Sequence, residues 1–250
     1  MKRGNSLSVW LLVVGCLFSY GCATEGYNKY SDDFFKQGVA WFKKGEYDQA
    51  AQDFTKVLEM APEGKENYVV YYNRGLAHYK MREYGRAIKD FDMALLLTPG
   101  GGLDRKYKPE IYDSTMEGKA QTPKIKYELF NTYKARGNAW YCQKNYRQAI
   151  DDYNMAVKFG PQRKELPSVF SDRAWAKFET GDFDGAIEDF SSALSIDPKL
   201  ARSYYGRAKA WSKNGNTDMA LREALMALKL EPENRDFDDL VFELKAAMKN

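Results

Sequence analysis

Five prolines divide most of the chain into segments that share one pattern, and this repetition constrains the fold more than any other feature. The prolines are Pro62, Pro99, Pro161, Pro198 and Pro232. An alanine stands twelve residues before each proline, and a Gly or Ala stands twenty-four residues before each. An aromatic residue stands eight residues before the first four, and alanine takes this place in the last segment. Columns that stay in register over five segments indicate that one structural unit is built five times.

Each segment predicts two helices joined by a short turn. Apolar residues recur at helical spacing, as in Ala186, Phe190 and Ala193. Small residues in two columns would let the two helices of a pair approach closely. The aromatic column would fill the gap between adjacent pairs, and the proline would stop the second helix.

This pattern resembles the tetratricopeptide repeat, a helix–turn–helix unit with a period of about 34 residues. The resemblance implies an all-α, right-handed superhelical solenoid over residues 31–232. The expected repeats are 31–64, 68–101, 130–163, 167–200 and 201–234.

An insertion and a C-terminal segment lie outside the repeated units. The step from Pro99 to Pro161 is 62 residues, which leaves 62 − 34 = 28 additional residues and predicts an insertion at about 100–129. We interpret the insertion as a surface excursion, with a flap over the binding groove as the alternative. Its last residues, Lys124 to Glu128, are expected to begin the next helix early. Apolar residues at helical spacing in 235–250 predict a C-terminal capping helix, which such arrays require.

The N-terminus is typical of an export signal. Two basic residues precede an apolar run from Val9 to Phe18, which has the size of the apolar part of a signal peptide and is short for a membrane span. Gly21-Cys22 resembles the lipobox of bacterial lipoproteins. This resemblance implies a signal peptide at 1–22, lipidation at Cys22, and a spacer at 23–30.

Alternatives remain for this segment. Cys16 is a second candidate for lipidation, and ordinary signal cleavage after Ala23 is a third interpretation. Ala23 after the preferred cysteine implies an outer-membrane lipoprotein that faces the periplasm. A secreted or periplasmic soluble protein is the alternative.

A recurring arginine predicts ion pairs within the repeats. It directly precedes the Gly/Ala column in four segments, and an acidic residue follows sixteen positions later, across the turn. The pairs are Arg74 with Asp90, Arg136 with Asp152, Arg173 with Asp189, and Arg207 with Glu223. The first segment has Gln37 against Asp53. Because the pattern repeats, we expect the pairs to be structural.

The resemblance also implies that the first helix of each repeat lines a concave groove. By register, the groove residues are Phe35, Phe42, Tyr72, Tyr79, Lys134, Asn138, Tyr141, Trp175, Phe178, Arg202, Tyr205, Lys209 and Lys213. Such a groove would be aromatic throughout and basic at its C-terminal end, which suits recognition of a protein or peptide. For any one of these aromatics, packing between repeats is the alternative.

Lys134 and Asn138 also resemble two positions of the carboxylate clamp found in chaperone-binding members of the family. Asp172 and Gly206 stand where that clamp has Asn and Arg. We therefore interpret the partial match as coincidence.

Charge and motifs limit the function. With 38 basic and 35 acidic residues the chain is too balanced for a typical nucleic-acid binder. One histidine and three cysteines argue against a metal site, and no phosphate-binding loop, zinc-protease motif or hydrolase elbow is present. We expect no cofactor and no catalysis.

The sequence thus predicts a scaffold or adaptor that binds a protein or peptide and is tethered to the bacterial envelope. Two alternatives remain. One is a homo-oligomerising assembly factor for a pilus or secretion machine. The other is a small-ligand receptor or enzyme, with the insertion closing over His78 and the groove tyrosines.

Overall fold

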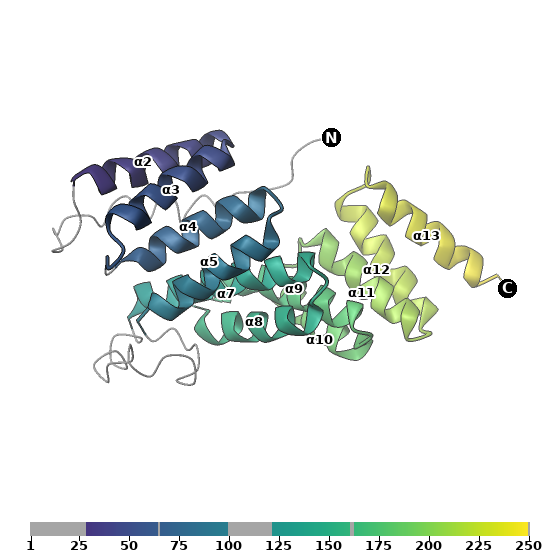
Figure 1. The fold of residues 1–250 in the computed structure, drawn as a ribbon. Helices are drawn as coiled ribbons and strands as arrows, with labels where there is room; N and C mark the ends of the chain where they lie inside the picture. The colour runs from purple at the N-terminus through teal and green to yellow at the C-terminus, as the bar shows by residue number, and fades with distance from the viewer. Residues whose placement is uncertain (1–28, 65, 100–121, 161–162, 250) are drawn as a thin grey trace. The chain divides into compact units, whose positions relative to one another are not determined.

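The computed structural model describes residues 29–64, 66–99, 122–160 and 163–249. Over these residues it contains α-helices, one short 3-10 helix and no strand (Figure 1). The helices are α2 (Lys29–Lys44), α3 (Tyr47–Met60), α4 (Asn67–Lys80), α5 (Tyr84–Leu97), α7 (Pro123–Cys142), α8 (Tyr146–Phe159), η2 (Arg163–Glu165), α9 (Leu166–Glu179), α10 (Phe183–Ile196), α11 (Ala201–Lys213), α12 (Thr217–Leu230) and α13 (Arg235–Ala247). The predicted all-α class is confirmed.

Contacts group the helices into two compact units, which we call unit 1 (α2–α5) and unit 2 (α7–α13). Consecutive helices form the pairs α2–α3 and α4–α5 in unit 1, and α7–α8, α9–α10 and α11–α12 in unit 2. Within each unit the second helix of a pair also contacts the first helix of the next pair. This stacking is that of a helical-repeat solenoid.

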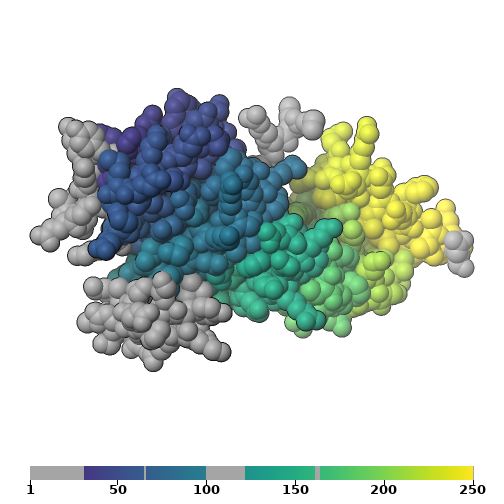
Figure 2. All heavy atoms as spheres, viewed as in Figure 1, coloured from purple at the N-terminus to yellow at the C-terminus, as the bar shows by residue number. Residues whose placement is uncertain are grey.

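α13 occupies the segment in which a capping helix was predicted. It packs on α12, and its Phe237 ring lies 4.9 Å from the ring of Tyr205 in α11. Phe237, Leu240, Val241 and Leu244 are buried. The atoms of α13 form the last layer of unit 2, drawn in yellow in Figure 2.

Small residues let the helices of a pair approach closely, as predicted. A Cβ added to Gly75 would lie 2.8 Å from the Phe91 ring, and one added to Gly137 would lie 2.8 Å from the Tyr153 ring. The aromatic column therefore packs inside its own pair as well as toward the next pair, where the sequence placed it. Phe190 does both, since it also lies directly against Gly206 of the next pair. A ring of this size reaches helices on both sides of its own.

The turn inside each pair needs a left-handed residue seven positions after the Gly/Ala column. Gly45, Gly181 and Gly215 supply it with φ between 78° and 88°. Arg82 and Lys144 adopt φ of 63° and 62° at the equivalent turns. Side chains with a Cβ are strained in this region, so these two turns carry a local cost.

Two helices extend into segments that the sequence analysis assigned to the insertion and to the spacer. α7 begins at Pro123, so the last seven residues of the predicted insertion 100–129 belong to a helix. The side chain of Thr122 accepts a hydrogen bond of 3.3 Å from the backbone N–H of Ile125, and Pro123 suits the first helical turn. α2 begins at Lys29, inside the predicted spacer 23–30.

Several predictions lie outside the described residues. These include the signal peptide 1–22, both candidate lipidation sites Cys22 and Cys16, and residues 100–121 of the insertion. Among the helices that the structure describes, none is both long and apolar enough to cross a bilayer.

Candidate functional site

The four predicted arginine pairs all form in the structure. The arginine Nε and Nη2 atoms donate hydrogen bonds of 2.6 to 3.0 Å to the carboxylate sixteen residues later. The three aspartates use both oxygens, whereas Glu223 accepts both bonds on one oxygen. The acidic side chains are nearly buried, so these groups hold the helix pairs together and are not free to bind a ligand.

The sequence analysis missed two further contacts of these arginines. Each guanidinium lies 5.4 to 5.6 Å from an aromatic ring three residues earlier, and these rings belong to Tyr71, Tyr133, Phe170 and Tyr204. Three of the arginines also reach the preceding helix pair. Arg74 donates to Thr55 at 3.1 Å, Arg173 to Asn154 at 2.7 Å, and Arg207 to Ser191 at 2.9 Å. The aromatic residue three positions before each arginine recurs in all four segments, so the contact between guanidinium and ring could have been predicted from the sequence.

In the first helix pair, where Gln37 replaces the recurring arginine, the carboxylate has a different partner. Asp53 is buried and accepts a hydrogen bond of 2.9 Å from Lys56, one turn along α3. Its second carboxylate oxygen has no hydrogen-bond partner among the described residues. The first pair therefore lacks the two hydrogen bonds that an arginine donates to the carboxylate in each of the other four.

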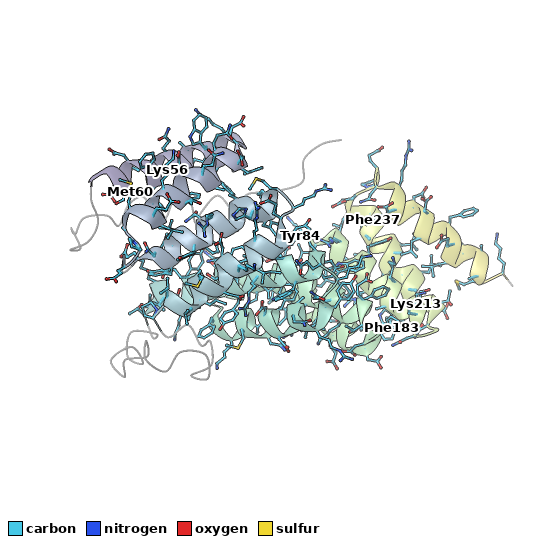
Figure 3. All side chains as sticks on the ribbon, viewed as in Figure 1. Lys56, Met60, Tyr84, Phe183, Lys213 and Phe237 are labelled. Atoms are coloured by element: carbon cyan, nitrogen blue, oxygen red, sulfur yellow. The ribbon has the colours of Figure 1, made fainter. Side chains whose placement is uncertain are left out.

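In unit 1 the predicted groove aromatics contact rings of their own pair. Phe35 is only 5% exposed and its ring lies 5.7 Å from that of Phe54. Tyr72 lies 5.9 Å from Phe91. Phe42 and Tyr79 meet Tyr47 and Tyr84 at 5.2 and 5.6 Å (Tyr84 is labelled in Figure 3). Packing within the repeats was the alternative role for these aromatics, and it applies to the groove aromatics of unit 1.

In unit 2 the aromatic residues form a cluster that crosses three helices. The Trp175 ring of α9 lies 5.8 Å from Phe178 on its own helix and 6.1 Å from Tyr205 of α11. Tyr205 in turn meets Phe237 of α13. Tyr141 also packs against this cluster, its ring lies 5.3 Å from that of Tyr146, and burial raises its pKa to about 12. We call Trp175, Phe178 and Tyr205 the unit 2 ring cluster.

Two predicted cations lie over this cluster. The guanidinium carbon of Arg202 is 5.6 Å from the centroid of Trp175. The Lys209 ammonium is 6.0, 5.7 and 5.6 Å from the rings of Trp175, Phe178 and Tyr205. Lys213 is exposed at the C-terminal end of α11 (Figure 3).

Lys134 and Asn138 are engaged by protein neighbours. Lys134 Nζ donates to Ser168 Oγ at 2.7 Å, and Asn138 Oδ1 accepts from the Tyr153 hydroxyl at 2.8 Å. Burial raises the pKa of Asp172, and the positive charges of Lys134 and Arg202 act in the opposite direction. The carboxyl of Asp172 therefore lies within electrostatic reach of two of the cations that a carboxylate ligand would need.

The single histidine belongs to the structural network of unit 1. His78 Nδ1 lies 2.7 Å from Glu83 Oε2, and its Nε2 lies 3.8 Å from Asp90. The hydrogen bond with His78 is the main cause that lowers the pKa of the Glu83 carboxyl. These contacts favour a structural role for His78. The predicted flap that would close over it lies mostly outside the described residues.

Comparisons with known proteins agree with this architecture. The family described as "Tetratricopeptide repeat" matches residues 34–64 and 68–100, and that described as "TPR repeat" matches 176–215. The solved structure of YrrB, described as a TPR protein with an unusual peptide-binding site, has a TM-score of 0.62 and 15% identity, covering 85% of this chain and 90% of YrrB. At this identity the likeness shows the fold.

Curated relatives match only in part. A DnaJ homolog subfamily C member 7 homolog of Dictyostelium discoideum is 33% identical over 46% of this chain and 22% of its own length. The Hsp70/Hsp90 co-chaperone CNS1 of Saccharomyces cerevisiae is 29% identical over 44% of this chain and 29% of its own length. The chain thus spans less than a third of the length of these relatives.

Proposed function

Since the chain is a tetratricopeptide-repeat protein, we propose that it is an interaction scaffold that binds a segment of another protein on the first helices of unit 2. The observation that carries the proposal is the unit 2 ring cluster with Arg202 and Lys209 above it. Aromatic residues and cations are the side chains that contribute most at protein interfaces. The names of YrrB and CNS1, which refer to a peptide-binding site and to a co-chaperone, are consistent with such a role. The proposal includes no catalytic step.

Site-specific photo-crosslinking in the native host tests this function. A photoreactive amino acid is placed at Lys213, at the end of α11, and in a control at Lys229 on α12; both positions are exposed. We expect an adduct with a partner protein at position 213 that is absent at 229. The adduct should also weaken when Lys209→Glu is added to a chain that remains folded. Equal adducts at both positions would contradict the proposed surface.

We also propose that the chain is tethered to the bacterial envelope through Cys22, with Cys16 as the alternative. The support is the basic and apolar N-terminal sequence followed by Gly21-Cys22. Metabolic labelling with a fatty acid analogue is expected to label the wild type and Cys16→Ala but not Cys22→Ala. Membrane fractionation of the same strains tests the expected outer-membrane location, and labelling of neither cysteine would refute the tether.

Self-association is a second candidate, because apolar side chains are exposed near the C-terminus. Phe242 is 75% exposed, and Leu225, Met226, Leu230 and Met248 are exposed as well. An assembly factor that works through copies of itself would bury such residues. Light scattering over a concentration series tests this, with Phe242→Ser expected to remove any concentration-dependent increase in mass.

A further inference from the structure

Arg202 and Lys209 carry charges that the described part of the chain leaves without an ion pair. Arg207 on the same helix is clasped by Glu223, and each of the other recurring arginines has its own carboxylate. No carboxylate in the part of the chain that the structure describes lies within ion-pair distance of Arg202 or Lys209. α11 itself contains no acidic residue. Arg202 and Lys209 therefore lack an ion pair among the described residues, and the carboxyl of Asp172 interacts with Arg202 only from beyond ion-pair distance.

The ring cluster fixes where these two charges lie. The Lys209 ammonium is within 6.0 Å of three ring centroids, and Arg202 lies within 5.6 Å of one of the same rings. Such contacts orient a cation without neutralising it. A single acidic segment that crosses Trp175 could therefore reach both charges.

The helix register extends the positive surface. Arg202, Lys209 and Lys213 are spaced by seven and four residues, so their side chains leave α11 on one face. We call these three residues the α11 cation stripe. On the α13 side, Asp236, Asp239 and Glu243 raise the pKa of Tyr205 through their negative charge, after the larger effect of burial. Charge complementarity therefore favours acidic ligand groups above α11 and disfavours them above α13.

One donor in the cluster lacks an acceptor. Trp175 is 8% exposed, and its indole Nε1 has no hydrogen-bond partner among the described residues. A buried N–H without an acceptor is uncommon and unfavourable in proteins. This donor lies in the ring over which both cations are held.

We propose that Arg202 and Lys209, held over the rings of Trp175, Phe178 and Tyr205, recognise acidic side chains in an extended segment of a partner protein. The inference rests on the scaffold function proposed above and names the chemistry of its ligand. It concerns side-chain carboxylates and not a free C-terminus, because Lys134 and Asn138 are already bonded to Ser168 and Tyr153. The carboxyl of Asp172 also interacts with the positive charges of Lys134 and Arg202.

Fluorescence polarisation with two matched peptides tests the proposal on the folded full-length chain. The probe is a labelled peptide of repeated Glu-Ser-Leu triplets, acetylated and amidated so that it has no terminal charge, and the control replaces Glu with Gln. We expect the Glu peptide to bind at least about tenfold more tightly than the Gln peptide, which is the effect of losing one charge-assisted hydrogen bond. Added salt should reduce this difference.

Matched variants assign the effect to the two cations. Lys209→Gln and Arg202→Gln are each expected to weaken binding of the Glu peptide about tenfold, whereas Lys229→Gln on α12 makes the same charge change and should alter it less than twofold. Lys209→Met keeps the aliphatic cover over the rings and should behave like Lys209→Gln. Circular dichroism melts show which variants remain folded.

Three results would overturn the proposal. They are equal affinity for the Glu and Gln peptides, an equal loss with Lys229→Gln, and no binding of the Glu peptide. If crosslinking at position 213 still captures a partner in any of these cases, the scaffold function stands and the acidic preference alone is rejected.

Discussion

The guanidinium of Arg74 clasps the carboxylate of Asp90 with hydrogen bonds of 3.0 and 2.7 Å and also donates to Thr55 in the preceding helix pair. The carboxylate is nearly buried and the arginine is partly covered. Removing only the arginine would leave a buried negative charge, which typically costs about 3 to 5 kcal/mol, whereas replacing both partners costs less. The cost should lie near the lower end of this range, because the Arg74 side chain is 19% exposed.

We therefore expect Arg74→Met to lower the free energy of unfolding by about 3 kcal/mol. The double variant Arg74→Met with Asp90→Leu should recover part of the loss. Urea denaturation followed by circular dichroism measures both. Arg86→Met is the control, since this arginine is exposed and pairs with Glu83 one turn earlier. Similar losses for Arg74→Met and Arg86→Met would count against a structural clasp.

The left-handed turn at Lys144 predicts a stabilising change. A residue with a Cβ at φ of 62° is strained, and glycine relieves the strain at some cost in chain entropy. Lys144→Gly should therefore raise the free energy of unfolding by roughly 0.5 to 1 kcal/mol. Gly181→Ala, at the equivalent turn of the next pair, should lower it by a similar amount. Thermal melts of both variants check the prediction, which a destabilised Lys144→Gly or a stabilised Gly181→Ala would refute.

The contact between His78 and Glu83 predicts a dependence on acid pH. The folded state lowers the pKa of Glu83 below its usual value of 4.5, so the contact stabilises the protein above that pH. The stabilisation is lost as pH falls through the lowered pKa. Glu83→Gln should thus reduce the melting temperature near neutral pH, and the difference from wild type should shrink as pH falls below 4.5 and disappear below the lowered pKa. A difference that persists at low pH would require another cause.

Two phenylalanines of α13 provide a matched test of the capping helix. Phe237 is 5% exposed and packs on Tyr205, whereas Phe242 is 75% exposed. Phe237→Ala should cost about 3 kcal/mol or more, and Phe242→Ala less than about 0.5 kcal/mol. Because Tyr205 supports Lys209, the first variant should also weaken binding of the Glu peptide. If truncation of Phe237 has no effect on stability, α13 does not act as a cap.

The sequence predicts features that depend on register and misses those that depend on side-chain direction. Arg136 and Asp152 could be paired because they lie sixteen residues apart on two antiparallel helices joined by a tight turn, which places them side by side. The same register placed Phe35 on the first helix, but it could not show that the ring points inward onto Phe54. The early start of the helix before the third repeat was expected from Lys124 onward, and the structure begins α7 at Pro123. Only the structure shows that Thr122 caps a helix there.

The hydrogen bonds from the recurring arginines to the preceding helix pair affect how the protein unfolds. Arg74, Arg173 and Arg207 each tie their own helix pair to the preceding one within the same unit. In a linear array, the strength of such neighbour contacts decides whether pairs are lost singly or in groups. A pair that separates from its neighbour must break this hydrogen bond, and the acceptor in the preceding pair, Thr55, Asn154 or Ser191, then loses its arginine. Unfolding within each unit is thereby made cooperative, and an unfolding front that starts at one helix pair spreads to the next.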